Sequence, residues 1–218
     1  MRLTGIFLYP DLVEFRGDAA LAFGFQTRFI CHYVQRFVAA RKVEAEGFKK
    51  ICVVCKSAAS ESTFKTSSNS LIAEVPFDIA AYEKTAMHAL PEYFIGLLQA
   101  GLAKASANQH LPAEVFQEAV GSFRALGYKN EWVHSARTFR SHKLKCRLLC
   151  ELDLSAFHLT LEVEREGELT LTQEILRTLP DEAIYAHRFK DIELDGQDLL
   201  VRDRFGRTLF ALNLEPAG

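Results

Sequence analysis

The sequence predicts an α+β fold, in which N-terminal mixed strands and helices are followed by a C-terminal antiparallel β-meander, with the helices packed on one face of the sheet. In residues 1–128, short β-branched runs alternate with stretches whose apolar residues recur at helical spacing. In residues 129–218, apolar residues recur at every second position, as in half-buried strands. We expect these parts, a helix-rich α/β half and an antiparallel β half, to share a core as one continuous domain.

The first elements follow from turn and cap residues. An apolar strand, Leu3–Leu8, stops at Pro10, and Asp18 is an N-cap from which one long helix is predicted to run to about Val43. The apolar residues of this helix recur every three or four positions and predict its buried stripe. They are Ile30, Tyr33, Val34, Phe37 and Val38.

Two further strands, Ile51–Cys55 and Leu71–Val75, flank a polar segment. That segment, Ser57–Ser70, has eight Ser or Thr among fourteen residues, a composition that predicts a mobile loop. Beyond the third strand, helical patterns are bounded by cap residues and prolines. Asp78 caps a helix through His88, Pro91 kinks it or begins a second one, and a last helix covers Ala113 to about Leu126, closed by Gly127.

The second half is predicted to be strands joined by short glycine turns. We expect strands at Glu131–Arg140, Lys143–Glu151, Ala156–Arg165, Leu169–Leu176, Ile184–Leu194, Leu199–Arg204 and Thr208–Leu214.

One register is predicted for the second and third of these strands. If their hairpin closes at Leu154-Ser155, paired residue numbers sum to 309, and one register satisfies both faces of the sheet. The solvent face then pairs opposite charges, and the core face pairs apolar side chains. The charged pairs are Lys143–Glu166, Lys145–Glu164 and Arg147–Glu162, and the apolar pairs are Cys146–Val163, Leu148–Leu161 and Cys150–Leu159.

Charge excludes some functions and favours another. The chain has 218 residues, 49% hydrophobic and 25% charged, with a formal net charge of −2, so we expect a globular protein with no direct nucleic-acid partner. From Glu151 to Asp198, however, thirteen acidic residues stand against four basic ones. This excess predicts an acidic face that docks a basic protein, the alternative being a solvated rim. Its residues are Asp181, Glu182, Asp191, Glu193, Asp195, Asp198 and Asp203.

Targeting and metal signals are weak. No uncharged apolar run approaches the roughly 18 residues of a membrane span, so we expect no membrane partner. Without a secretory signal, the five cysteines predict reduced thiols in the cytoplasm. We expect no metal and no cofactor. The metal alternative is the evenly spaced set His142, Cys146 and Cys150, which lacks a fourth ligand.

The sequence contains no phosphate-binding glycine pattern, no nucleophile elbow and no zinc-protease motif. We therefore expect a non-enzymatic, cytoplasmic protein-binding protein, of the kind of bacterial immunity or antitoxin proteins, that neutralises a basic toxin. The alternative is an enzyme that acts on a small molecule or nucleotide in a pocket between the halves. In that hypothesis Tyr185, His187 and Asp191 are catalytic and Ser57–Ser70 is a lid. A homo-oligomer is compatible with both hypotheses.

Overall fold

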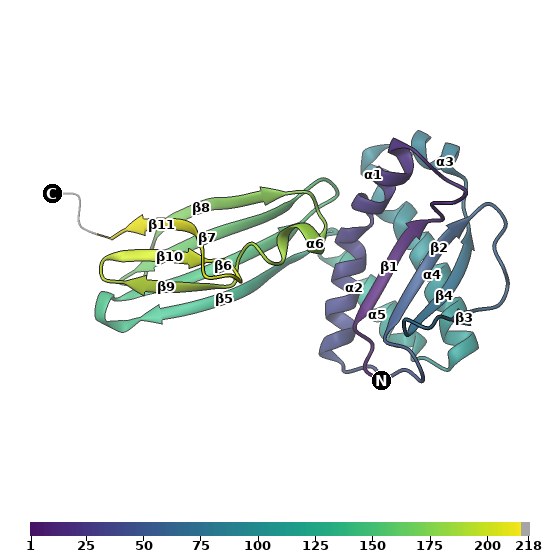
Figure 1. Ribbon diagram of the computed structural model, residues 1–218, viewed down its shortest axis with the longest axis horizontal. Helices are drawn as coiled ribbons and strands as arrows, with labels where there is room; N and C mark the ends of the chain where they lie inside the picture. The colour runs from purple at the N-terminus through teal and green to yellow at the C-terminus, as the bar shows by residue number, and fades with distance from the viewer. Residues whose placement is uncertain (215–218) are drawn as a thin grey trace. The chain divides into compact units, whose positions relative to one another are not determined.

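The structure, a computed structural model that describes residues 1–214, confirms the α+β class (Figure 1). The chain divides into two compact units, Met1–Asn130 and Glu131–Gly218, the latter including residues 215–218, which lie outside the described part. The sequence placed the division between residues 128 and 129. The shared core stays a prediction, and the units are described separately.

Unit 1 contains a four-stranded sheet in the order β1-β2-β4-β3. Strands β1 (Gly5–Pro10), β2 (Lys50–Lys56) and β4 (Ser70–Pro76) are parallel. The fourth strand, β3 (Phe64–Lys65), runs antiparallel to β4. It lies within the segment that composition predicted to be a loop.

Helices cover one face of this sheet. Ile51, Val53 and Cys55 on that face are 0% exposed. Helix α4 (Leu90–Gln109) packs against β2 and β4, and it lies behind them in Figure 1. Phe7 and Ile72 belong to the opposite face and remain half-buried.

The predicted helix from Asp18 to Val43 is wrong in its continuity. It is two helices, α1 (Asp18–Gln26) and α2 (Arg28–Ala40), which meet at Thr27, and the N-cap is Gly17 rather than Asp18. Thr27 is fully buried, and its hydroxyl donates a 2.7 Å hydrogen bond to the Leu8 carbonyl oxygen in β1. Because this side chain is bonded to the strand, the two helices are joined to the sheet at their junction.

The remaining helices begin where the cap residues predicted. The Asp78 carboxylate accepts hydrogen bonds from the amides of Ala80 and Ala81, but α3 (Ile79–Lys84) ends before His88. A short 3₁₀ turn, Met87–Ala89, precedes α4, which has Pro91 in its first turn. Helix α5 (Ala113–Ala125) is followed by Gly127, whose φ of +64° suits a helix end.

Unit 2 is built from two antiparallel sheets rather than one continuous meander. The first has the order β5-β6-β7-β8, and the second has the order β11-β10-β9. Their apolar faces supply the core of this unit, which includes Cys146, Leu161 and Val201. The strands are β5 (Glu131–Phe139), β6 (Leu144–Leu152), β7 (Phe157–Arg165), β8 (Glu168–Thr178), β9 (Asp191–Asp195), β10 (Asp198–Arg202) and β11 (Thr208–Asn213). A 3₁₀ turn, Arg140–His142, joins β5 to β6.

The first part of the predicted strand Ile184–Leu194 is wrong. A short helix, α6 (Glu182–Tyr185), occupies it, and Asp181 caps that helix by accepting a hydrogen bond from the Ala183 amide. The apolar pattern of this segment reflects side-chain stacking rather than strand alternation. The Tyr185 ring stacks on Phe157 with 3.8 Å between the ring centroids.

The predicted register of β6 and β7 is confirmed. Lys145 lies opposite Glu164 and Arg147 opposite Glu162, while Cys146 meets Val163 on the core face. All three predicted ion pairs form, with nitrogen–oxygen distances of 2.6 Å for Lys143–Glu166, 3.3 Å for Lys145–Glu164 and 2.7 Å for Arg147–Glu162.

A charge swap tests this register. We expect Lys145→Glu, which sets two carboxylates opposite each other, to lower the free energy of unfolding by roughly 0.2–1 kcal/mol. The effect should lie at the lower end because the Lys145 side chain is 53% exposed. Adding Glu164→Lys should restore the loss, as measured by urea unfolding. A double variant that is less stable than either single variant would contradict the register.

A second prediction concerns the contact of α4 with β2. A Cβ added at Gly101 would lie 2.4 Å from both methyl carbons of Val53, whereas one added at Gly96 in the same helix meets nothing within 4 Å. We expect Gly101→Ala to destabilise unit 1 by roughly 1–3 kcal/mol through overpacking. Gly96→Ala is the matched control and should stabilise by about 0.5–1 kcal/mol. Equal unfolding free energies for the two variants would refute the close contact.

Candidate protein-binding site

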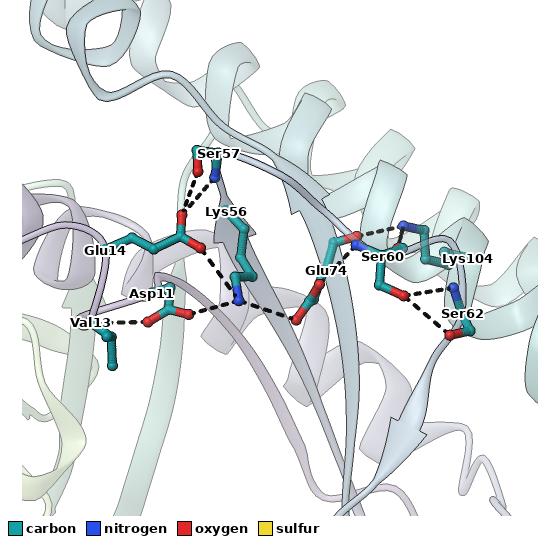
Figure 2. A network of polar contacts seen from close by, with 9 residues as sticks. All are labelled: Asp11, Val13, Glu14, Lys56, Ser57, Ser60, Ser62, Glu74 and Lys104. Carbon is teal, nitrogen blue, oxygen red and sulfur yellow. Dashed lines mark hydrogen bonds and ion pairs between the residues drawn. The ribbon is translucent and has the colours of Figure 1, made fainter.

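The carboxyl ends of the parallel strands carry an ion cluster (Figure 2). Ligands of open α/β sheets bind at this edge, so it is the first place to seek a site. Lys56 Nζ lies 3.2 Å from Asp11, 3.4 Å from Glu14 and 3.7 Å from Glu74, each distance measured to a carboxylate oxygen. These four side chains join the ends of β1, β2 and β4.

This cluster is held in its ionised form. The Val13 amide and then Lys56 lower the pKa of Asp11, and the Ser57 amide and hydroxyl lower the pKa of Glu14. The hydrogen bond to Asp11 is the first cause of the raised pKa of Lys56. Groups that transfer protons at neutral pH need pKa values shifted towards neutrality, and these are shifted away from it. The arrangement therefore favours a structural role for the cluster.

The Ser/Thr-rich segment is bonded to the same edge. The Ser60 amide donates a 2.8 Å hydrogen bond to Glu74, and Lys104 Nζ donates to the carbonyl oxygens of Ser60 and Glu74 at 2.7 and 2.6 Å. Ser57 donates both its amide and its hydroxyl to Glu14. The segment is thus bonded to this edge through the backbone of Ser60 and through the amide and hydroxyl of Ser57, while its role as a lid stays a prediction.

Three of the seven acidic residues predicted to bind a partner are paired within unit 2. Arg137 Nε donates a 2.9 Å hydrogen bond to Asp191. The bond from Arg137 is the first cause that lowers the pKa of Asp191 to about 2. Glu193 lies 3.2 Å from Arg202, and Asp203, only 6% exposed, lies 2.8 Å from Arg207.

The other four acidic residues occupy caps and a turn. Asp181 caps α6, and Glu182 lies in its first turn. Asp195 and Asp198 are exposed and lie opposite each other across β9 and β10, where Asp198 accepts a hydrogen bond from Asn213. Because three predicted members are paired internally, the acidic excess of the sequence yields a smaller acidic surface than its sum suggests.

The alternative catalytic residues have different surroundings. Tyr185 is 3% exposed and stacked on Phe157. The His187 ring is exposed, 6.2 Å from the ring of Phe205, and Asp191 is bonded to Arg137. The catalytic role of this group stays a prediction.

The alternative metal ligands do not converge on one point. Cys146 and Cys150 are buried on β6, where a rise of about 3.3 Å per residue separates their Cα atoms by about 13 Å. Two ligands of one zinc ion must each lie about 2.3 Å from it. Within residues 1–214, no group of three His, Cys, Asp or Glu side chains is arranged to hold a metal.

A pocket that the sequence did not predict lies on the outer face of the β5–β8 sheet. It has a volume of about 360 Å³ and combines apolar, hydroxyl and carboxylate side chains. Val133, Leu149 and Thr160 lie in one cross-strand row, and Val133 is 52% exposed. We call it the acidic pocket, and the residues around it are Glu131, Trp132, Val133, Leu149, Cys150, Glu151, Thr160, Glu162 and Thr172.

The carboxylates of the acidic pocket are crowded. Glu131 lies directly opposite Glu151 across β5 and β6, an arrangement of like charges that disfavours folding. Glu162, with a side chain only 17% exposed, lies 2.7 Å from Arg147. Within residues 1–214, Glu151 has no ion pair with a Lys, Arg or His. One signal for the pocket was present in the sequence, since Leu149 is an apolar residue at a position that the alternation assigns to solvent.

Comparison with known proteins adds no functional assignment. No protein-family model, curated protein or solved structure matches this chain. None of the helices in residues 1–214 combines the length and apolar composition needed to cross a membrane. A functional proposal therefore depends on the residues themselves.

His158 lies opposite Glu151 on β7, and its ion pairs should make the free energy of unfolding depend on pH. Its nitrogens lie 2.5 Å from Glu174 and 3.2 Å from Asp153. Burial lowers the pKa of His158, but hydrogen bonds to these two carboxylates outweigh it and raise the pKa overall. A pKa raised on folding stabilises the protein below the unfolded value of about 6.5, and the contribution is lost as the pH rises through the folded value.

We expect His158→Gln to reduce the free energy of unfolding more at about pH 5.5 than at about pH 8.5. Arg177, which lies opposite His158 on β8, is positively charged at both values and does not alter the sign. Urea unfolding at the two pH values measures the difference. Glu174→Gln should reduce the pH dependence, and an equal effect of His158→Gln at both values would contradict the ion pairs.

Proposed function

We propose that this chain is a non-enzymatic protein-binding protein that receives a basic side chain of its partner in the acidic pocket. The observation that carries the proposal is the combination of an apolar floor, Val133 and Leu149, with the carboxylate of Glu151, since the neighbouring Glu162 is already paired with Arg147. Lys and Arg have the complementary shape, since their aliphatic stems cover apolar surface while their charged heads reach a polar rim.

The like-charge contact at the pocket supports this proposal. Glu131 lies opposite Glu151 across β5 and β6, and a cation of the partner that lies between the two carboxylates is attracted by both. Asp195 and Asp198 at the β9–β10 turn add to the negative field that accelerates encounter with a basic partner.

In this proposal the partner is a basic toxin, and the chain acts as a bacterial immunity or antitoxin protein in the cytoplasm. Nuclease toxins carry basic clefts, for which a complementary acidic surface gives rapid capture. All five cysteines are free and buried, which suits a reducing compartment.

Glu151→Lys tests the proposal, because it should change binding and stability in opposite directions. At about pH 8.5, above the range in which His158 on the other side of Glu151 is mainly protonated, its new positive charge opposite Glu131 should raise the free energy of unfolding by roughly 0.2–1 kcal/mol. Capture of a basic partner, encoded by a neighbouring gene and co-expressed with the full chain, should fall at least about tenfold. Pull-down and urea unfolding measure the two effects.

The matched control is Glu168→Lys, the same charge change at the far end of β8. It should leave capture within about twofold of the unaltered chain. Capture that Glu151→Lys leaves unchanged would overturn the proposal, as would the failure of the unaltered chain to bind any basic neighbour product.

A further inference from the structure

A second surface of unit 2 carries the opposite charge. It brings together the segment before β9, residues 186–190, and the turn between β10 and β11, residues 203–207. The Arg204 amide donates a 3.1 Å hydrogen bond to the His187 carbonyl oxygen, and the Lys190 amide donates a 2.7 Å bond to that of Arg202. We call its five exposed residues, His187, Arg188, Lys190, Arg204 and Phe205, the basic aromatic patch.

The turn holds Phe205 in an exposed position. The Asp203 carboxylate accepts hydrogen bonds from the amides of Phe205 and Arg207 at 2.7 and 2.8 Å, and from Arg207 Nε at 2.8 Å. The two amide bonds involve the backbone of the turn, and Phe205 is 69% exposed. The Arg207 guanidinium lies 5.2 Å from the centre of its ring, so an apolar ring is presented within a positively charged surface.

The positive charge of this patch is not compensated by the carboxylates around it. In the described part of the chain, Arg188, Lys190 and Arg204 form no ion pair. The nearest acidic residues along the chain are already paired: Asp191 with Arg137, Glu193 with Arg202, and Asp203 with Arg207. Three positive charges therefore lie without a counterion on the two segments that form the basic aromatic patch.

We propose that the basic aromatic patch binds single-stranded nucleic acid, with one base stacked on Phe205 and phosphates bound by Arg188, Lys190 and Arg204. Single-strand binding combines cations that follow the backbone with an aromatic ring that accepts any base. A duplex keeps its bases stacked on each other, so it has no free base for the ring. An acidic polypeptide would use the cations but has no need of an exposed ring between them. This inference goes beyond the proposed function and concerns a different sheet.

The expectation of no nucleic-acid partner followed from a net charge of −2 over the whole chain. Association with nucleic acid depends on local charge rather than on the sum. Arg188 and Lys190 are separated from Arg204 by more than ten residues and by two strands, and the fold brings them to one surface.

The test is fluorescence anisotropy of a labelled single-stranded oligonucleotide of about ten nucleotides, titrated with the full chain at about 50 mM salt. We expect binding whose logarithmic salt dependence has a slope of about −2, as three phosphate contacts in a single strand predict. Phe205→Ala should weaken binding roughly tenfold, and Phe205→Tyr should retain it. The double variant Arg188→Ala with Arg204→Ala should weaken binding and reduce the slope.

Arg140→Ala is the matched control, because it removes one exposed arginine that lies outside the basic aromatic patch, in the turn after β5. It should leave the affinity within about twofold. Thermal unfolding of each variant confirms that it is folded. Absence of binding, or equal losses in the patch variant and in Arg140→Ala, would overturn the proposal. Polyglutamate that displaces the oligonucleotide while Phe205→Ala has no effect would identify an acidic protein as the partner and would also overturn it.

Discussion

The pairing of β6 with β7 is the constraint on which unit 2 depends. Strand side chains alternate between two faces, so a slip of one residue would expose Cys146 and Leu148 and would bury Lys145 and Arg147. Only one register buries the apolar row and leaves three oppositely charged pairs on the outside. On the other side of β6, the pairing with β5 contains a bulge between Val133 and Ser135 and places Glu131 opposite Glu151.

The outer face of this sheet carries ion pairs at one end and a contact between like charges at the other. Towards the β6–β7 open end, Lys143, Lys145 and Arg147 each have a glutamate. Towards the hairpin turn, Leu149 replaces the next cation in the alternation, and Glu151 lies between the carboxylate of Glu131 on β5 and the imidazole of His158 on β7. The ladder explains why the sheet tolerates this contact, since each of its pairs contributes about as much as one like-charge contact removes. The ion pairs that stabilise the sheet and the acidic pocket therefore lie on one surface.

The sequence determines those features that depend on neighbouring residues. The β6–β7 register, the Asp78 cap and the helix start at Pro91 follow from alternation, turns and caps within about twenty residues. The break at Thr27 does not, because it depends on a hydrogen bond to Leu8. Likewise, α6 lies in a segment with strand-like alternation because Tyr185 stacks on a ring of another strand.

The distribution of surface charge also depends on contacts between residues that are distant in the sequence. Counting acidic residues from Glu151 to Asp198 predicts an acidic surface, but the count ignores Arg137 and Arg202, which the fold brings to Asp191 and Glu193. These pairings offset the charge of both carboxylates, and Arg188, Lys190 and Arg204 have no counterion among the described residues. The sign of the charge on a surface is therefore set by which residues are left over after pairing. In this protein, pairing leaves an uncompensated negative charge at Glu151 on one sheet and uncompensated positive charges near Phe205 on the other. The net charge of the whole chain, −2, shows neither of them.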